Sequence, residues 1–141
     1  MKTVLYLACF ILMVSCQSGS TTTSITMKQS ALKNTQIQEH TFLKEMYEDA
    51  YFPEFLVDKC KEVLLVLCQQ IEEKEPANLE ELYALSHAAT DQLNDLQEEF
   101  FENDSEIETV ARECLAMDFL FIAEAYGFEA DVEALIATRD W

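Results

Sequence analysis

Glycine and proline are scarce in this chain, and this scarcity limits what it can fold into. There are two of each in 141 residues. Sandwiches, barrels and Rossmann folds need a turn glycine about every ten residues, because their tight turns use backbone conformations that other residues avoid. Half of the residues are apolar and 11% are aromatic, so a packed core is available. The composition therefore predicts helices joined by short polar links.

Apolar residues recur at steps of three and four after residue 35, which is the spacing of amphipathic helices. Residues of the types that start or end helices divide this region. These boundary residues are Pro53, Asn78 with Glu81, Ser105 with Glu108, and Gly127. The helices expected between them span about 36–51, 53–75, 78–101, 105–126 and 130–138. Short links make neighbours antiparallel, so we expect an all-α fold, a single small bundle of four to five helices, mostly antiparallel.

Charge is distributed very unevenly along the chain. All 27 acidic residues lie at or after Glu39, and only 6 basic residues follow Gln36, which gives a net charge of −21. Nucleic acid and anionic membrane surfaces would be repelled, so neither is an expected partner of the domain. The charge is typical either of solubility alone or of binding to a basic protein. The expected contact residues lie on the helix over 78–101: Glu80, Asp95, Glu98, Glu99 and Glu102.

The first 16 residues resemble a bacterial lipoprotein signal. Lys2 precedes an apolar run of about 12 residues, too short to span a bilayer as a stable helix, and the run ends at Cys16. We expect Cys16 to become the lipidated first residue of the mature chain. Ordinary cleavage near Ser15 or Cys16 and an uncleaved anchor remain alternatives. Residues 17–35 are rich in Ser, Thr and Gln and predict a flexible linker, with the helical domain over 36–141. The expected location is the cell envelope, on its periplasmic side, with membrane contact only through Cys16.

The three cysteines of the domain are expected to be small buried apolar residues. Cys60 and Cys68 are eight residues apart on one predicted helix, about 12 Å along its axis, so they cannot bond to each other. A disulfide between one of them and Cys114 is the alternative. No spacing of cysteines and histidines indicates zinc. Calcium-loop and di-iron patterns are absent as well, and we predict no metal or cofactor.

Several strings in the domain are similar to a known family of small bacterial proteins. They span about residues 38–141, and the strings are these: Phe42-Leu43-Lys44-Glu45-Met46-Tyr47-Glu48-Asp49-Ala50-Tyr51-Phe52-Pro53, Tyr83-Ala84-Leu85-Ser86-His87-Ala88-Ala89-Thr90, Ser105-Glu106-Ile107-Glu108-Thr109 and Ala125-Tyr126-Gly127-Phe128. The family is catalogued only as a domain of unknown function. The resemblance implies an all-α fold and the domain boundary, and it implies no activity, cofactor or catalytic residue.

Asp118 is the first residue to consider for chemistry. It lies next to an apolar stripe on the helix over 105–126, formed by Val110, Cys114, Met117, Phe121 and Ala125. A carboxylate in such surroundings must find hydrogen-bond donors, stay protonated or line a cavity. We expect Asp118 to be bonded to a neighbouring helix, and the alternative is a role in a pocket.

His87 is the second candidate. Tyr83 and Asp91 lie four residues before and after it, so the three side chains share one helical face and could form a hydrogen-bonded row. A histidine between tyrosine and aspartate is a possible general base. Because no nucleophile stands beside it, the structural role is favoured.

Three hypotheses follow for function. The first is a non-enzymatic binding module held at the cell envelope. A narrower form of it is an acidic immunity-type or inhibitor protein that neutralises a basic partner by charge complementarity. The third is a small helical enzyme that uses His87 and Asp118 in a cleft.

Overall fold

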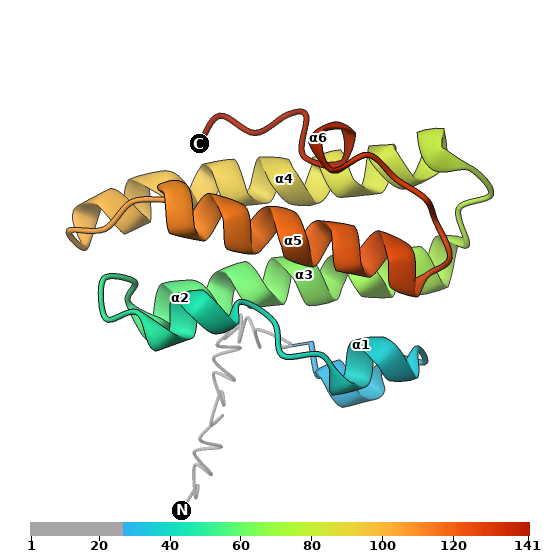
Figure 1. Ribbon diagram of the computed structural model, residues 1–141, viewed down its shortest axis with the longest axis horizontal. Coiled ribbons are helices and arrows are strands. Elements are labelled where there is room, and N and C mark those ends of the chain that lie inside the picture. Colours follow the sequence, from blue (N-terminus) through green and yellow to red (C-terminus); the bar gives the residue numbers. More distant parts are fainter. Residues whose placement is uncertain (1–26) are drawn as a thin grey trace, which may run out of the picture.

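The computed structural model describes residues 27–141, and every regular element in that part is a helix. Three long helices form the body: α3 (Glu54–Lys74), α4 (Leu79–Glu102) and α5 (Thr109–Ala125). α3 and α5 run in one direction and α4 in the other (Figure 1). Four shorter elements complete this part of the chain: η1 (Gln29–Ala31), α1 (Thr35–Glu39), α2 (Lys44–Glu48) and α6 (Val132–Leu135). The all-α, mostly antiparallel bundle predicted from the sequence is confirmed.

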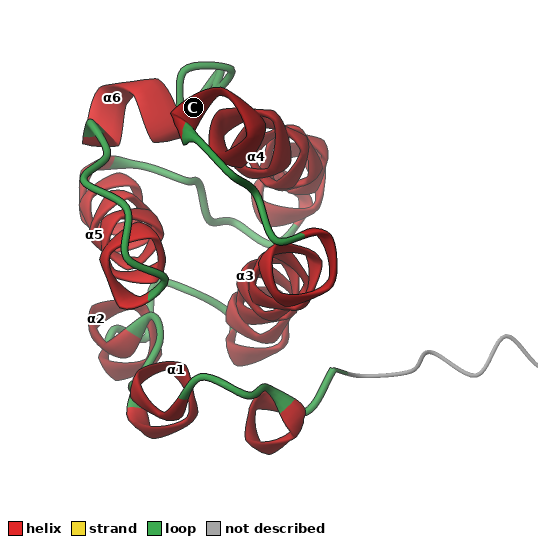
Figure 2. Ribbon diagram, turned by 90° about the vertical axis from the view of Figure 1, so that its right-hand side faces the viewer, coloured by secondary structure: helices red, strands yellow, loops and turns green. Residues whose placement is uncertain are grey.

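The helices form two layers with the core between them. α3 and α4 form an antiparallel hairpin on one side, and α2, α5 and α6 lie on the other (Figure 2). The largest side chains that are fully buried come from both layers and from the loops beside them. They include Leu56, Leu64, Leu82, Leu93, Phe100, Leu115 and Phe119. None of the helices in the described residues has the length and apolar character of a membrane span.

Two of the predicted helix boundaries are confirmed in atomic detail. The Asn78 side chain accepts a hydrogen bond from Glu81 N at 3.0 Å, and the Glu81 carboxylate accepts one from Ala77 N at 2.8 Å. Gly127 adopts a φ of 86° just after α5. Its N–H and that of the next residue, Phe128, bond back to the carbonyls of Glu124 and Ala123, which ends the helix in a Schellman motif.

The prediction of one continuous helix over 36–51 is wrong, because the structure has two short helices there, α1 and α2. His40 is extended, and Leu43 adopts the left-handed conformation with a φ of 54°. The break lets Phe42 and Leu43 enter the core side by side. The carboxylate of Asp118 on α5 binds the backbone N–H of Leu43, so tertiary contacts override a local helical pattern.

Two further boundaries differ from the sequence prediction. Residues 105–108 are not helical, so Ser105 caps no helix, and α5 begins only at Thr109. The last helix is restricted to Val132–Leu135 instead of 130–138. Residues after it bond to α4: Asn94 Nδ2 donates to the carbonyl of Thr138, and Asp140 N donates to Asn94 Oδ1. Trp141 folds back and is buried.

Residues 27–34 form an N-terminal strap that lies along α3. Leu32 is buried, and the backbone N–H of Met27 donates to Glu62 at 2.6 Å. The carboxylate of Glu72 accepts hydrogen bonds from the backbone N–H groups of Lys33 and Asn34, at 2.8 to 3.0 Å. The flexible linker expected over 17–35 is therefore packed structure from residue 27 on. Its first part, the predicted signal and Cys16 lie outside the described residues.

Glu72 is one attachment point of the strap, and it also accepts a hydrogen bond from the hydroxyl of Tyr126 at 2.9 Å. Burial raises the pKa of this carboxyl, but the bonds from Lys33 N, Asn34 N and Tyr126 outweigh burial and lower the pKa below its usual 4.5. A lowered pKa in the folded state means that the ionised group stabilises the fold.

We expect Glu72→Ala to lower the free energy of unfolding by about 1–3 kcal/mol at pH 7, because backbone donors of the strap lose a charged acceptor. The lowered pKa gives the sign of the pH dependence. The difference from wild type is fully present above pH 4.5 and shrinks as the pH falls through the lower folded-state value. Denaturant unfolding at several pH values measures it. Glu73→Ala, at an exposed neighbour, is the control, and an equal loss in both variants would contradict the assignment.

Candidate functional site

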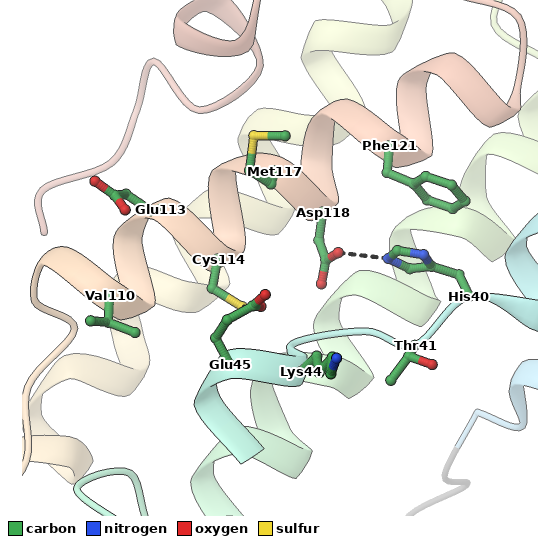
Figure 3. Close-up of a pocket in the computed structure, with 10 residues that line it drawn as sticks. All are labelled: His40, Thr41, Lys44, Glu45, Val110, Glu113, Cys114, Met117, Asp118 and Phe121. Carbon is green, nitrogen blue, oxygen red and sulfur yellow. Dashed lines mark hydrogen bonds and ion pairs between the residues drawn. The ribbon is translucent and has the colours of Figure 1, made fainter. Parts of the chain in front are cut away.

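A cavity of about 710 Å³ opens between α5 and the segment that joins α1 to α2. We call it the α5 cavity (Figure 3). One wall consists of residues of α5, and the other of residues between the end of α1 and the first turn of α2. The lining residues are His40, Thr41, Lys44, Glu45, Val110, Glu113, Cys114, Met117, Asp118 and Phe121.

Four of the five residues of the apolar α5 stripe noted in the sequence form the floor of this cavity: Val110, Cys114, Met117 and Phe121. Met117 is 62% exposed and Val110 is 39% exposed, so the stripe is not the face that α5 turns to the core. The buried face lies beside it and consists of Ala111, Cys114, Leu115, Asp118, Phe119, Ile122 and Ala123. Because α5 is apolar on both faces, periodicity alone does not select the inward one. The short α2 covers only part of the second face.

Asp118 is a buried residue of the cavity wall and bonds to two partners from the α1–α2 junction. Its Oδ1 lies 2.7 Å from His40 Nε2, and its Oδ2 accepts a hydrogen bond from Leu43 N at 2.8 Å. Burial raises the pKa of this carboxyl, and the bonds from His40 and Leu43 oppose that rise. The expectation that Asp118 bonds to a neighbouring element is confirmed, and the residue also lines a pocket.

Two aromatic rings fix the orientation of the His40 ring. It stacks on Phe121 with the ring centres 3.8 Å apart, and it meets Phe42 edge-on at 4.6 Å. The imidazole and the Asp118 carboxylate thus form an oriented, hydrogen-bonded pair at a cavity wall. No sequence pattern points to this pair, because its members are 78 positions apart and no motif links them.

Glu45 and Cys114 form a second contact across the cavity. The Cys114 thiol donates to Glu45 Oε2 at 3.4 Å. Burial raises the pKa of this thiol to about 12, and the adjacent carboxylate adds to the effect. Hydrogen bonds from its own backbone and from Cys114 lower the pKa of Glu45. At neutral pH the thiol is therefore protonated and the carboxylate ionised, so Cys114 is a hydrogen-bond donor there and a poor nucleophile.

The model of a protein family matches residues 36–141, three quarters of the chain, and its description is a family of unknown function, DUF5713. The chain belongs to this family. The resemblance noted in the sequence is thereby confirmed as far as the family and its unknown function are concerned. No curated protein and no solved structure matches the chain. Every residue that lines the α5 cavity lies inside the matched region, whereas the N-terminal strap lies before it.

Within the DUF5713 domain, His87 lies on another side of the molecule from Asp118. Its Nε2 is 2.7 Å from the carbonyl oxygen of Ala134 on α6, and its ring is parallel to that of Tyr83 at 6.2 Å. The Tyr83 hydroxyl accepts from Asp131 N at 3.3 Å. Asp91 is exposed and does not join this row. The structure therefore joins Tyr83 and His87 but does not bring His87 and Asp118 together.

Of the five acids singled out on α4, four are exposed: Glu80, Asp95, Glu98 and Glu102. Glu99 is half-buried and forms an ion pair with Lys59 of α3, at 2.5 and 2.7 Å. This acid therefore stabilises the α3–α4 hairpin instead of facing outward freely.

The cysteines behave as the sequence predicted. Cys60, Cys68 and Cys114 are buried and free. Burial raises the pKa of Cys60 and of Cys68 to about 12. Among residues 27–141, no three His, Cys, Asp or Glu side chains are grouped so that they could hold a metal ion.

We expect Asp118→Ala to lower the free energy of unfolding by about 2–4 kcal/mol. The substitution leaves the buried N–H of Leu43 and the ring of His40 without their acceptor, and each loss costs about 1–3 kcal/mol. Asp91→Ala is the matched control, because Asp91 is exposed and its change should stay within about 0.5 kcal/mol. Denaturant unfolding compares the two variants. A loss below 1 kcal/mol for Asp118→Ala would show that the junction does not depend on this carboxylate.

Proposed function

We propose that this protein is a non-enzymatic binding module held at the bacterial cell envelope through a lipid on Cys16, and that its partner is a basic protein. The observation that supports it best is the set of exposed acids along α4. Glu80, Asp95, Glu98 and Glu102 form no hydrogen bond or ion pair with another side chain in the described residues. An unneutralised row of this kind on one helix is complementary to a basic face.

The overall charge supports the same proposal. Residues 27–141 hold all 27 acids but only eight lysines and arginines, and only three of their ion pairs involve Lys or Arg. Most of the negative charge is therefore available to an approaching partner. Complementary charge mainly raises the rate of association. A narrower form of the proposal is an immunity-type or inhibitor protein that neutralises a basic toxin.

The alternative of a small enzyme that uses His87 and Asp118 has less support. These two side chains bond to different elements, α6 and the α1–α2 junction. The imidazole–carboxylate pair that does form is that of His40 and Asp118, and the one thiol beside it stays protonated. A general base without a nearby nucleophile favours binding over covalent chemistry.

The basic partner is tested by capture from the native host at low ionic strength, with each captured protein identified. We expect a basic protein whose capture falls about tenfold or more as salt rises to 1 M, where the Debye length is about 3 Å. At low ionic strength, the triple variant Asp95→Asn, Glu98→Gln, Glu102→Gln should capture about tenfold less of this basic protein. The triple variant Glu39→Gln, Glu124→Gln, Glu129→Gln removes the same charge from exposed positions elsewhere and should retain it. Capture of an acidic protein, or equal loss in both variants, would contradict an α4 contact.

The lipid anchor is tested separately, and its motivation is the apolar run that ends at Cys16. We expect the wild-type protein in the membrane fraction and labelled by palmitate, and Cys16→Ala unlabelled and in the soluble fraction. The α4 variants should stay in the membrane fraction. A wild-type protein that is soluble and takes up no label would refute the anchor. The proposal of a basic partner would then still be tested by the capture experiment.

A further inference from the structure

We propose that the α5 cavity is a binding site for a small organic cation: an ammonium group on a short apolar body. The α4 acids lie on the other layer of the bundle, so this site is separate from the proposed protein contact (Figure 2). Three features of the cavity carry the inference: its size, its uncovered apolar floor and the carboxylates on its walls.

The size fits a small molecule. Pockets that hold small ligands measure about 300–1,000 Å³ and are lined mainly by apolar side chains with a few polar groups. The α5 cavity has about 710 Å³, and the bonded pair of His40 and Asp118 forms part of its wall. Figure 3 shows this pair between Phe121 and Cys114, with the side chain of Met117 close by.

An apolar ligand would bury the exposed apolar side chains of the cavity floor. Val110 and Met117 are large apolar side chains that α2 leaves uncovered, although they belong to one stripe with the half-buried Phe121. Covering such surface is favourable because it removes apolar area from water. Met117 can also adapt to ligands of different shape, since its side chain is unbranched and polarisable.

The charge on the walls selects a cation. Glu45 from α2 and Glu113 from α5 both line the cavity, and neither forms an ion pair within the part of the chain that the structure describes. The Glu45 carboxylate accepts from the Cys114 thiol and from its own backbone N–H, and no donor of another residue reaches it among residues 27–141 besides that thiol. Lys44 is the one lysine among the lining residues. Its Nζ lies 3.8 Å from Oε1 of Glu48, a residue that does not line the cavity. An ammonium group could therefore donate to Glu45 while its apolar body covers Met117, whereas a carboxylate ligand would be repelled.

The test uses three probes with the same chain and different head groups: hexylamine, hexanol and hexanoate. Each is titrated into the full-length protein, and backbone amide shifts are followed by NMR. We expect hexylamine to bind most tightly, hexanol about tenfold or more weakly, and hexanoate not measurably, because a hydrogen bond to a charged group is worth about a factor of ten or more. The shifts should be centred on Glu45, Cys114 and Met117.

Two variants and a control locate the site. Glu45→Gln keeps an acceptor for the thiol but removes the charge, and it should weaken hexylamine about tenfold. Met117→Lys places a cation at an exposed position of the floor, which should abolish binding without disturbing the core. Glu124→Gln, on the same helix but outside the cavity, should change nothing. Equal binding of the amine and the acid, hexylamine shifts centred on α4, or equal effects of Glu45→Gln and Glu124→Gln would each overturn the proposal.

Discussion

The two hydrogen bonds of the Asp118 carboxylate are the interaction on which the arrangement of α1, α2 and α5 depends. The carboxylate is buried on α5, and it holds the backbone N–H of Leu43 and the ring of His40, two groups that a continuous helix over 36–51 would not present together. A residue other than glycine in the left-handed conformation costs about 1–2 kcal/mol, and the hydrogen bond to a charged acceptor together with the burial of Phe42 and Leu43 offsets that cost. The break that results turns α2 against α5 and creates the mouth of the α5 cavity. The local strain and the candidate site therefore have one origin.

Sequence reasoning succeeded where the deciding signals are local. The bounds of α3 and α4, the cap at Asn78 and the left-handed end at Gly127 depend on residues within a few positions of one another, and they were predicted correctly. Sequence reasoning failed where a residue far away in the chain determines the local structure. The break at Leu43 depends on Asp118, 75 positions away, and the His40–Asp118 pair has no sequence signature. Ser105 followed by Glu108 has the pattern of a capping box, yet Ser105 is buried beyond the helix end and has no partner for its hydroxyl among the described residues.

The buried face of α5 illustrates a different limit of prediction from sequence. Periodicity identifies an inward face only when the opposite face is polar, and α5 is apolar on both. Four of the five residues of the stripe line a cavity, and Met117 among them is mostly exposed. On α4, by contrast, acidic residues mark the outer face clearly, so its burial could be read from the sequence. The same contrast separates the two proposed sites. One lies on the charged face of the α3–α4 layer and the other on the apolar face of the opposite layer, so occupation of one leaves the other accessible (Figure 2).

The N-terminal strap would have a mechanical consequence if the proposed lipid anchor at Cys16 holds the domain. Ten residues separate Cys16 from Met27, so a fully extended tether reaches about 40 Å at most. Any pull on that tether enters the domain at the hydrogen bond between Met27 and Glu62. The next contacts along the strap are the bonds from Gln29 to the carbonyls of Ile37 and His40, followed by those from Lys33 and Asn34 to Glu72. Because His40 lines the α5 cavity, the strap would carry part of such a load to the wall of that cavity as well as to α3.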